Sequence, residues 1–179
     1  FSFGIICFGC ENDLKEVEQL TQKEKLPLKK GKNVQLIYSE KAVVKIKVSA
    51  PKMEEYASEN PYLEMSEGIE VIFFDSLKQV NTILTANYAI HRIKENIMEA
   101  KNDVVVVNEK GEKLNTEHLV WKQDSAKIYS DEFVKITAQD EILMGEGFEA
   151  NEDFTKWKIN KIKGTILLKE NKDSTAVSP

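Results

Sequence analysis

Val43-Val44-Lys45-Ile46-Lys47-Val48-Ser49-Ala50 alternates apolar and polar side chains along most of its length. Successive side chains of a β-strand point to opposite faces, so Val44, Ile46, Val48 and Ala50 share one face and the polar residues share the other. The segment predicts a strand whose sheet packs on one side and meets water on the other, as antiparallel sheets do.

Similar apolar units recur at short intervals along the rest of the chain. Polar turns separate them, and Asn108-Glu109-Lys110-Gly111 is a hairpin signal, because glycine can take the positive φ that such a turn requires. The expected strands are residues 34–39, 43–50, 69–74, 80–93, 97–100, 104–107, 113–121, 127–136, 141–150 and 157–168. This rhythm predicts an all-β fold, an open, twisted antiparallel sheet of the jellyroll type.

Length and composition favour one folded domain. The chain has 179 residues, of which 41% are hydrophobic, enough for one substantial core. We expect a signal or lipoprotein remnant at 1–10, a polar tether at 11–33, the β-jellyroll at 34–168 and a disordered tail at 169–179. The net charge of −5 mixes 25 basic with 30 acidic residues, which argues against nucleic acid as a partner.

The N-terminus carries a candidate lipidation site. Residues 1–9 are apolar but too short to span a bilayer, and they look like the surviving end of a signal peptide. Phe8-Gly9-Cys10 resembles the end of a bacterial lipoprotein signal, which would make Cys10 the lipidated residue. A clipped transmembrane anchor and an ordinary apolar N-terminus remain alternatives. Cys7 and Cys10 lack the strand-to-helix context of a redox pair.

The remaining candidate residues do not form a catalytic or metal site. His91 and His118 fall in strand-like runs with no ligand cluster at the right spacing, and we interpret them as sheet-surface residues. Gly145-Glu146-Gly147 lacks the third glycine and the helix of a phosphate loop. The two glycines indicate a bulge or a close backbone approach, either where the sheet opens toward a lipid or partner or at a simple bend. No enzyme activity, cofactor or metal is predicted.

Four segments in order resemble the LptC family, the periplasmic component of the bacterial lipopolysaccharide export machine. They are Asn96-Ile-Met-Glu-Ala100 with the valines 104–107; Gly111-Glu-Lys-Leu-Asn-Thr-Glu-His-Leu-Val-Trp121; Ile128-Tyr-Ser-Asp131 with Phe133-Val-Lys-Ile136; and Gly145-x-Gly147-Phe-Glu-Ala150. The resemblance covers residues 96–166, and residues before Gly68 share only the strand rhythm. Cys10 departs from the better-known members, which have a full transmembrane helix.

The resemblance implies a fold and a function. The fold would be the open, twisted OstA/LptC-like β-jellyroll, with an apolar slot for lipid A acyl chains. The protein would receive lipopolysaccharide from an inner-membrane ABC transporter and pass it to a periplasmic bridge protein of the LptA type. It would lie in the periplasm, anchored to the inner membrane.

The apolar pattern supports a lipid guest independently. A one-sided sheet without a covering helix must either close on itself or hold something apolar. Alternation within each expected strand selects the lipid-binding set: Val44, Ile46, Val48, Leu84, Ala86, Tyr88, Ile90, Leu119, Trp121, Val134, Ile136, Phe148, Ala150, Trp157 and Ile159.

The last apolar run is a candidate for an unpaired outer strand, and in the family such a C-terminal edge docks the next bridge component. An open sheet edge offers N–H and C=O groups to another chain. The expected partner-edge residues are Gly145, Gly147, Ile162, Thr165, Ile166 and Leu167. An alternative function is that of a β-sandwich lipoprotein for adhesion or carbohydrate binding, with a closed interior and ligand-binding loops.

Overall fold

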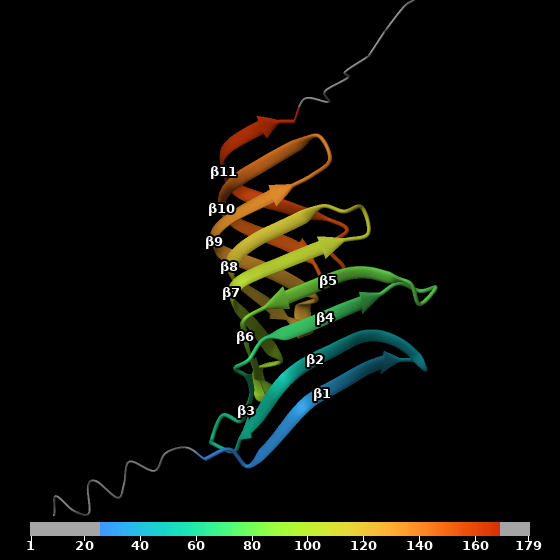
Figure 1. The fold of residues 1–179 in the computed structure, drawn as a ribbon, viewed down its shortest axis with the longest axis vertical. Helices are drawn as coiled ribbons and strands as arrows, with labels where there is room; N and C mark the ends of the chain where they lie inside the picture. Colours follow the sequence, from blue (N-terminus) through green and yellow to red (C-terminus); the bar gives the residue numbers. More distant parts are fainter. Residues whose placement is uncertain (1–25, 169–179) are drawn as a thin grey trace, which may run out of the picture.

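The computed structural model describes residues 26–168, which form one antiparallel sheet of eleven strands (Figure 1). The strands are β1 (Lys29–Glu40), β2 (Val43–Tyr56), β3 (Tyr62–Met65), β4 (Ile69–Phe74), β5 (Val80–Ala86), β6 (Tyr88–Arg92), β7 (Ile97–Asn108), β8 (Lys113–Lys122), β9 (Lys127–Thr137), β10 (Glu141–Asn151) and β11 (Trp157–Leu167). Two 3-10 turns, η1 (Ile93–Glu95) and η2 (Gln123–Ser125), are the only helical elements of this part of the chain. The predicted all-β fold is confirmed. The predictions for 1–10 including Cys10, for the tether up to residue 25 and for the tail lie outside the described residues.

The sheet is folded lengthwise into two walls. The second half of β7 pairs with β5, and β5 leads through β4 to the first half of β2. The first half of β7 pairs with β6, which leads through β3 to the last residues of β2. We call the side with β4 and β5 the first wall and the side with β3 and β6 the second wall. The long strands cross from one wall to the other.

Irregular pairing at one level lets the long strands bend. The register shifts between Lys101 and Val104 in β7 and between Thr116 and Val120 in β8. In β10 the shift surrounds Gly147, whose φ is 75°. A bulge bends its strand and increases the local twist, so these shifts turn the sheet from one wall into the other. Gly68, with a φ of 100°, separates β3 from β4 at the same turn of the sheet.

A polar contact stabilises the inside of this bend. The Thr116 hydroxyl is buried and donates to the Phe133 backbone carbonyl at 3.0 Å. Its oxygen also lies 3.4 Å from the Ser130 hydroxyl, and Ser130 is buried too. Buried hydroxyls need such partners, and a backbone carbonyl of β9 supplies one here.

Three predicted boundaries are corrected. The sheet begins at Lys29, five residues before the expected start at 34, because Lys29 and Lys30 pair with Glu55 and Glu54 of β2 at 3.0 and 3.3 Å. The expected strand 80–93 is two strands, β5 and β6, separated at Asn87, whose N–H donates to the Asn102 carbonyl at 3.0 Å. The expected strands 97–100 and 104–107 are one strand, β7.

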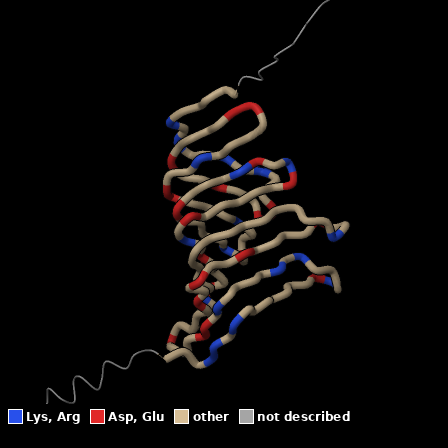
Figure 2. Tube along the Cα trace, viewed as in Figure 1, with Lys and Arg blue, Asp and Glu red and all other residues tan. Residues whose placement is uncertain are grey.

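Charged residues are spread along the strands and turns among uncharged ones (Figure 2). The inward faces of both walls form a single apolar core. The alternation within residues 43–50 therefore defines the inward face of β2, since Ile46, Val48 and Ala50 are all buried.

Replacing Gly147 by Ala should destabilise the protein more than replacing Gly111 by Ala. Both glycines have a similar positive φ, 75° and 76°, so an added Cβ costs about 1–2 kcal/mol at each. Only at Gly147 does that Cβ also meet a neighbour, Asn160 Nδ2 at 2.9 Å, while nothing lies within 4 Å at Gly111. Urea unfolding measures both losses. Equal losses in the free energy of unfolding would show that the contact between residue 147 and Asn160 does not contribute to stability.

Candidate functional site

The interior between the two walls collects most of the predicted lipid-binding residues. Ten of the predicted residues are buried members of one core cluster, namely Ile46, Val48, Leu84, Ala86, Leu119, Trp121, Val134, Ile136, Phe148 and Ala150. Trp157 and Ile159 of β11 are partly buried and pack against that cluster. Val44 is only half-buried and is not part of it.

Two predicted residues, Tyr88 and Ile90, do not face the interior. The break at Asn87 shifts the alternation by one residue, so Ala89 and His91 are buried in β6 instead. The Tyr88 hydroxyl lies on the outside and donates to the Glu64 carboxylate at 2.8 Å. Alternation holds only within one strand, and a one-residue slip moves every later side chain to the other face.

The two histidines lie on opposite faces of the sheet. His118 is on the outer surface, with Nε2 3.3 Å from a Glu99 carboxylate oxygen, as a surface residue should be. His91 is buried, which corrects its interpretation as a surface residue. Burial lowers the pKa of His91, and the nearby Gln123 side chain opposes that shift only in part. No described residue has hydrogen-bonding geometry to either of its ring nitrogens.

Glu99 organises the ion pairs of the outer surface of the second wall. Its carboxylate lies 2.7 Å from an Arg92 guanidinium nitrogen and 2.8 Å from Lys101 Nζ. Partial burial opposes its ionisation, but hydrogen bonds from Lys101 and Arg92 outweigh that effect and lower the pKa of Glu99 to about 2. This group stabilises neighbouring strands and does not face the interior.

Core side chains fill most of the interior, and the slot for acyl chains stays a prediction. Two cavities among the core residues measure about 20 Å³ each. A water molecule needs about 10–15 Å³ of such volume, so each cavity has room for about one water and not for an acyl chain. Phe154 lines one cavity, and Phe73, which contacts Phe154, lines the other.

Phe154 lies on the turn between β10 and β11, residues 152–156, which we call the strap. The strap leaves the second wall and reaches across to the first, where the Thr82 hydroxyl of β5 donates to the Asp153 carbonyl at 3.2 Å. The Phe154 ring is 3% exposed and meets Phe73 edge to face, with centroids 6.1 Å apart. Sequence reasoning interpreted residues 152–153 as turn residues and missed Phe154, whose only signal is an aromatic residue within a polar turn.

A cleft of about 670 Å³ opens beside the strap, between the ends of strands from both walls. Ile46 and Phe73 contribute apolar lining, and Lys45, Asp75 and Glu152 contribute charged groups. Burial, together with the neighbouring Asp153 charge, raises the pKa of Glu152. The cleft therefore joins solvent to the apolar core at the place where the strap crosses.

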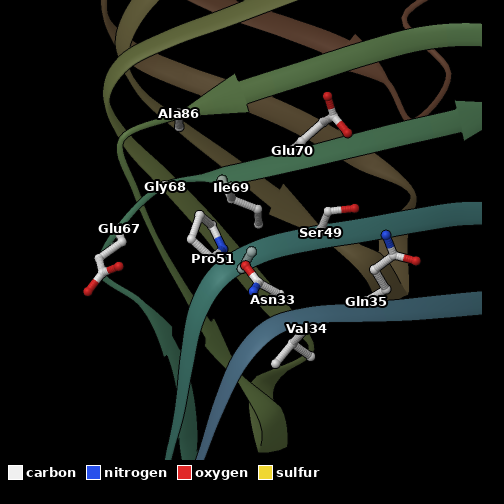
Figure 3. A pocket seen from close by; sticks show the side chains of 11 residues that line it. Asn33, Val34, Gln35, Ser49, Pro51, Glu67, Gly68, Ile69, Glu70 and Ala86 are labelled. Atoms are coloured by element: carbon white, nitrogen blue, oxygen red, sulfur yellow. The ribbon is translucent and has the colours of Figure 1, made fainter.

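Two further grooves are lined by outward-facing residues together with buried ones, such as Ala50 and Ile69 in the first and Ile128 and Phe148 in the second. One of about 440 Å³ follows the bend between β1, β2 and β4, lined by Asn33, Ser49, Pro51, Gly68 and Glu70 among others (Figure 3). The other, about 890 Å³, lies over β9, β10 and β11. The described residues contain no group of three or more potential metal ligands.

Both ends of the sheet are free edges. β1 pairs only with β2, and β11 pairs only with β10. Ile162, Ile166 and Leu167 of β11 are exposed to 62%, 49% and 74%. Thr165 of the same strand is also exposed, and it pairs with Leu143 of β10.

Gly145 and Gly147 are buried in β10 and do not lie on the free edge, which corrects their place in the partner-edge set. A side chain at Gly145 would collide with the Lys161 carbonyl and the Ile159 side chain. These glycines thus permit a close approach between β10 and β11, the structural reading of the motif.

Comparison with known proteins gives one clear result. A family model described as "Lipopolysaccharide-assembly, LptC-related" matches residues 3–166. A search of curated proteins finds no match. Within residues 26–168, no helix has the length and apolar character needed to cross a membrane.

The stability of the protein should fall as the pH drops from 7.5 to 5.5, in part because of His91. The pKa of His91 in the folded protein lies below the ordinary value of 6.5, so as the pH falls the unfolded chain takes up a proton before the folded chain does. The stability that neutral His91 contributes is therefore complete above pH 6.5 and is lost as the pH falls below 6.5. A His91→Leu variant should lose this component of the pH dependence, whereas His118→Asn on the outer face should keep it. Urea unfolding at both pH values measures the difference. An unchanged pH dependence in His91→Leu would contradict the assignment.

Proposed function

The chain belongs to the LptC family of lipopolysaccharide-assembly proteins, with a role in lipopolysaccharide transport, and from this premise we propose its place in the pathway. It receives lipopolysaccharide from an inner-membrane ABC transporter and holds the acyl chains between its two walls. It then passes the lipid to a periplasmic bridge protein of the LptA type.

The two-walled apolar interior with a free edge at each end is the observation that supports this proposal. A partner strand added to either edge would extend both walls, so the interior of one protein would continue into that of the next. Burial of apolar surface yields roughly 25 cal/mol per Å², so acyl chains can be held without specific polar chemistry. Transfer along such a path needs no chemical step.

We assign the bridge protein to the β11 edge, which leaves the β1 edge for the transporter. The Leu168 N–H donates back to the Asp140 carbonyl at 2.7 Å. Because N–H directions alternate along a strand, the Thr165 N–H points away from β10, toward the free edge. The β11 edge therefore presents a backbone donor at Thr165 for a partner strand.

We further propose that the protein acts in the periplasm, held at the inner membrane through a lipid on Cys10. The sequence Phe8-Gly9-Cys10 and the polar stretch that follows it support this anchor. Incorporation of labelled fatty acid, present in the wild type and absent in a Cys10→Ser variant, tests it directly.

The filled interior favours a second candidate, a closed β-sandwich lipoprotein that binds its ligand through loops. Mass spectrometry of the purified protein distinguishes the two functions. Co-purified acyl chains support transport, and a lipid-free protein that binds oligosaccharide supports the second candidate. Depletion of the protein in its source bacterium should also lower surface lipopolysaccharide if the transport role is correct.

Photo-crosslinkers on the two faces of one strand should separate lipid contact from surface contact. A benzoylphenylalanine at Ile136, whose side chain is buried in the interior, should form lipopolysaccharide adducts in cells. The same group at Lys135, the preceding residue of β9, points outward and should form few or none. Thermal melting of both variants controls for folding. Equal adduct yields at the two positions would reject the interior as the lipid site.

A Thr165→Pro variant should weaken docking of the bridge protein and leave lipid loading intact. Proline removes the backbone donor that faces the free edge, and the β10–β11 pairing does not use that donor. Thr165→Val keeps the N–H and is the matched control. Co-purification with the bridge protein and lipid content by mass spectrometry provide the two readouts. Intact docking in a folded Thr165→Pro protein, or a loss of lipid with docking retained, would exclude this edge.

A further inference from the structure

We propose that the space around Phe154 is the acyl-chain subsite of this protein, closed in the lipid-free chain by the Phe154 ring itself. The strap, residues 152–156, would move outward when a lipid chain takes the place of the ring. This inference rests on the proposed function, since it identifies where between the walls an acyl chain lies.

The origin of Phe154 sets it apart from the rest of the core. Every other buried apolar side chain among residues 26–168 belongs to a strand, and Phe154 alone comes from a turn. Its backbone φ is 56°, a left-handed conformation that is unusual for a bulky residue. Such conformations persist when the surroundings enforce them, and they occur often at ligand clamps and switch segments.

The Phe154 ring occupies the part of the apolar interior that an acyl chain would have to enter. Phe154 lines the cavity formed with Val106, Leu114 and Ile136, and its ring contacts Phe73. Phe73 in turn lines the second cavity, together with Trp121 and other core residues. Withdrawal of the ring would therefore enlarge the first cavity into an apolar space, and Phe73 would stand between that space and the second cavity.

The attachments of the strap suit a segment that moves as a unit. Within it and its flanks, the Asn151 side chain binds both Thr155 and Lys156 at 2.8 Å, and the Asp153 carboxylate accepts the Thr155 hydroxyl at 2.7 Å. Across the interior, the hydrogen bond from Thr82 to the Asp153 carbonyl holds it to the first wall. Loss of that bond and of the Phe73 contact would free the strap without unfolding the turn.

An entry path adjoins the strap. The cleft of about 670 Å³ is lined by Asn151, Glu152 and Asp153 on one side and by Phe73 and Ile46 on another. Phe73 therefore borders the cleft outside and touches the Phe154 ring inside. An acyl chain that entered here would meet Phe73 first and then the space that Phe154 occupies, while its polar headgroup stayed in the cleft.

Three variants and one probe test the proposal with the complete chain. Phe154→Gly removes the ring and suits the positive φ. Thr82→Val removes only the hydroxyl, which binds the Asp153 carbonyl of the strap and also lies 2.8 Å from Asn81 Oδ1. The probe is dansyl-labelled undecanoic acid, whose emission rises in apolar surroundings. Both variants should bind it at least about tenfold more tightly than the wild type, which corresponds to about 1.4 kcal/mol. Phe133→Ala is the control, because that ring is 52% exposed on the outer face, and its affinity should not change.

The outcomes separate this inference from the proposed function. If the wild type binds the probe and neither variant binds it more tightly, the strap does not control access to the interior. That result would overturn this inference and would still support acyl-chain binding by the protein. Weaker binding by Phe154→Gly would make the ring a wall of the site and also overturn the inference. If Phe154→Gly does not fold, Thr82→Val decides alone, because valine keeps the shape of threonine. Absence of binding by every protein would overturn the proposed lipid role together with the subsite.

Discussion

The apolar face of a sheet has to be covered, and among the described residues only the sheet itself is available to cover it. The two 3-10 turns contribute no buried residue. Folding the sheet into two walls buries the inward face of each against the other, and the hydrophobic effect supplies the driving force. The bulges at the bend and the long strands that cross it follow from that requirement. So do the free edges, because a sheet folded in this way does not close its ends.

Much of the fold could be predicted from the sequence because alternation within a strand is a local property. Spacing alone identified six buried residues of β2, β8 and β9 correctly, namely Ile46, Val48, Leu119, Trp121, Val134 and Ile136, but it missed others such as Leu114 and Ile128 and placed the half-buried Val44 among them. Tyr88 and Ile90 were assigned to the wrong face because the break at Asn87 depends on a distant partner, the Asn102 carbonyl of β7. The early start of β1 similarly depends on Glu54 and Glu55 of β2, which lie more than twenty residues away.

The site was less predictable than the fold. Gly145 and Gly147 form a motif that was assigned to the partner edge. In the structure they let β10 and β11 approach each other at the bend. Phe154 was not predicted as a site residue, because a turn residue enters the core only if the strap crosses to the opposite wall. That crossing is visible only in three dimensions, through the contacts of the strap with Thr82 and Phe73. Local patterns define faces, and tertiary contacts decide what fills the space between them.

A filled interior and a lipid-carrying interior are compatible if the filler can leave. An empty apolar slot wide enough for acyl chains would sacrifice dispersion contacts along both walls, so a stable lipid-free chain needs some apolar group in that place. Withdrawing the backbone of a strand residue would break the sheet pairing. A ring on a turn can leave while the eleven strands stay paired. The location of Phe154 on the strap, and not merely its burial, is what reconciles a stable lipid-free protein with an interior able to accept a lipid.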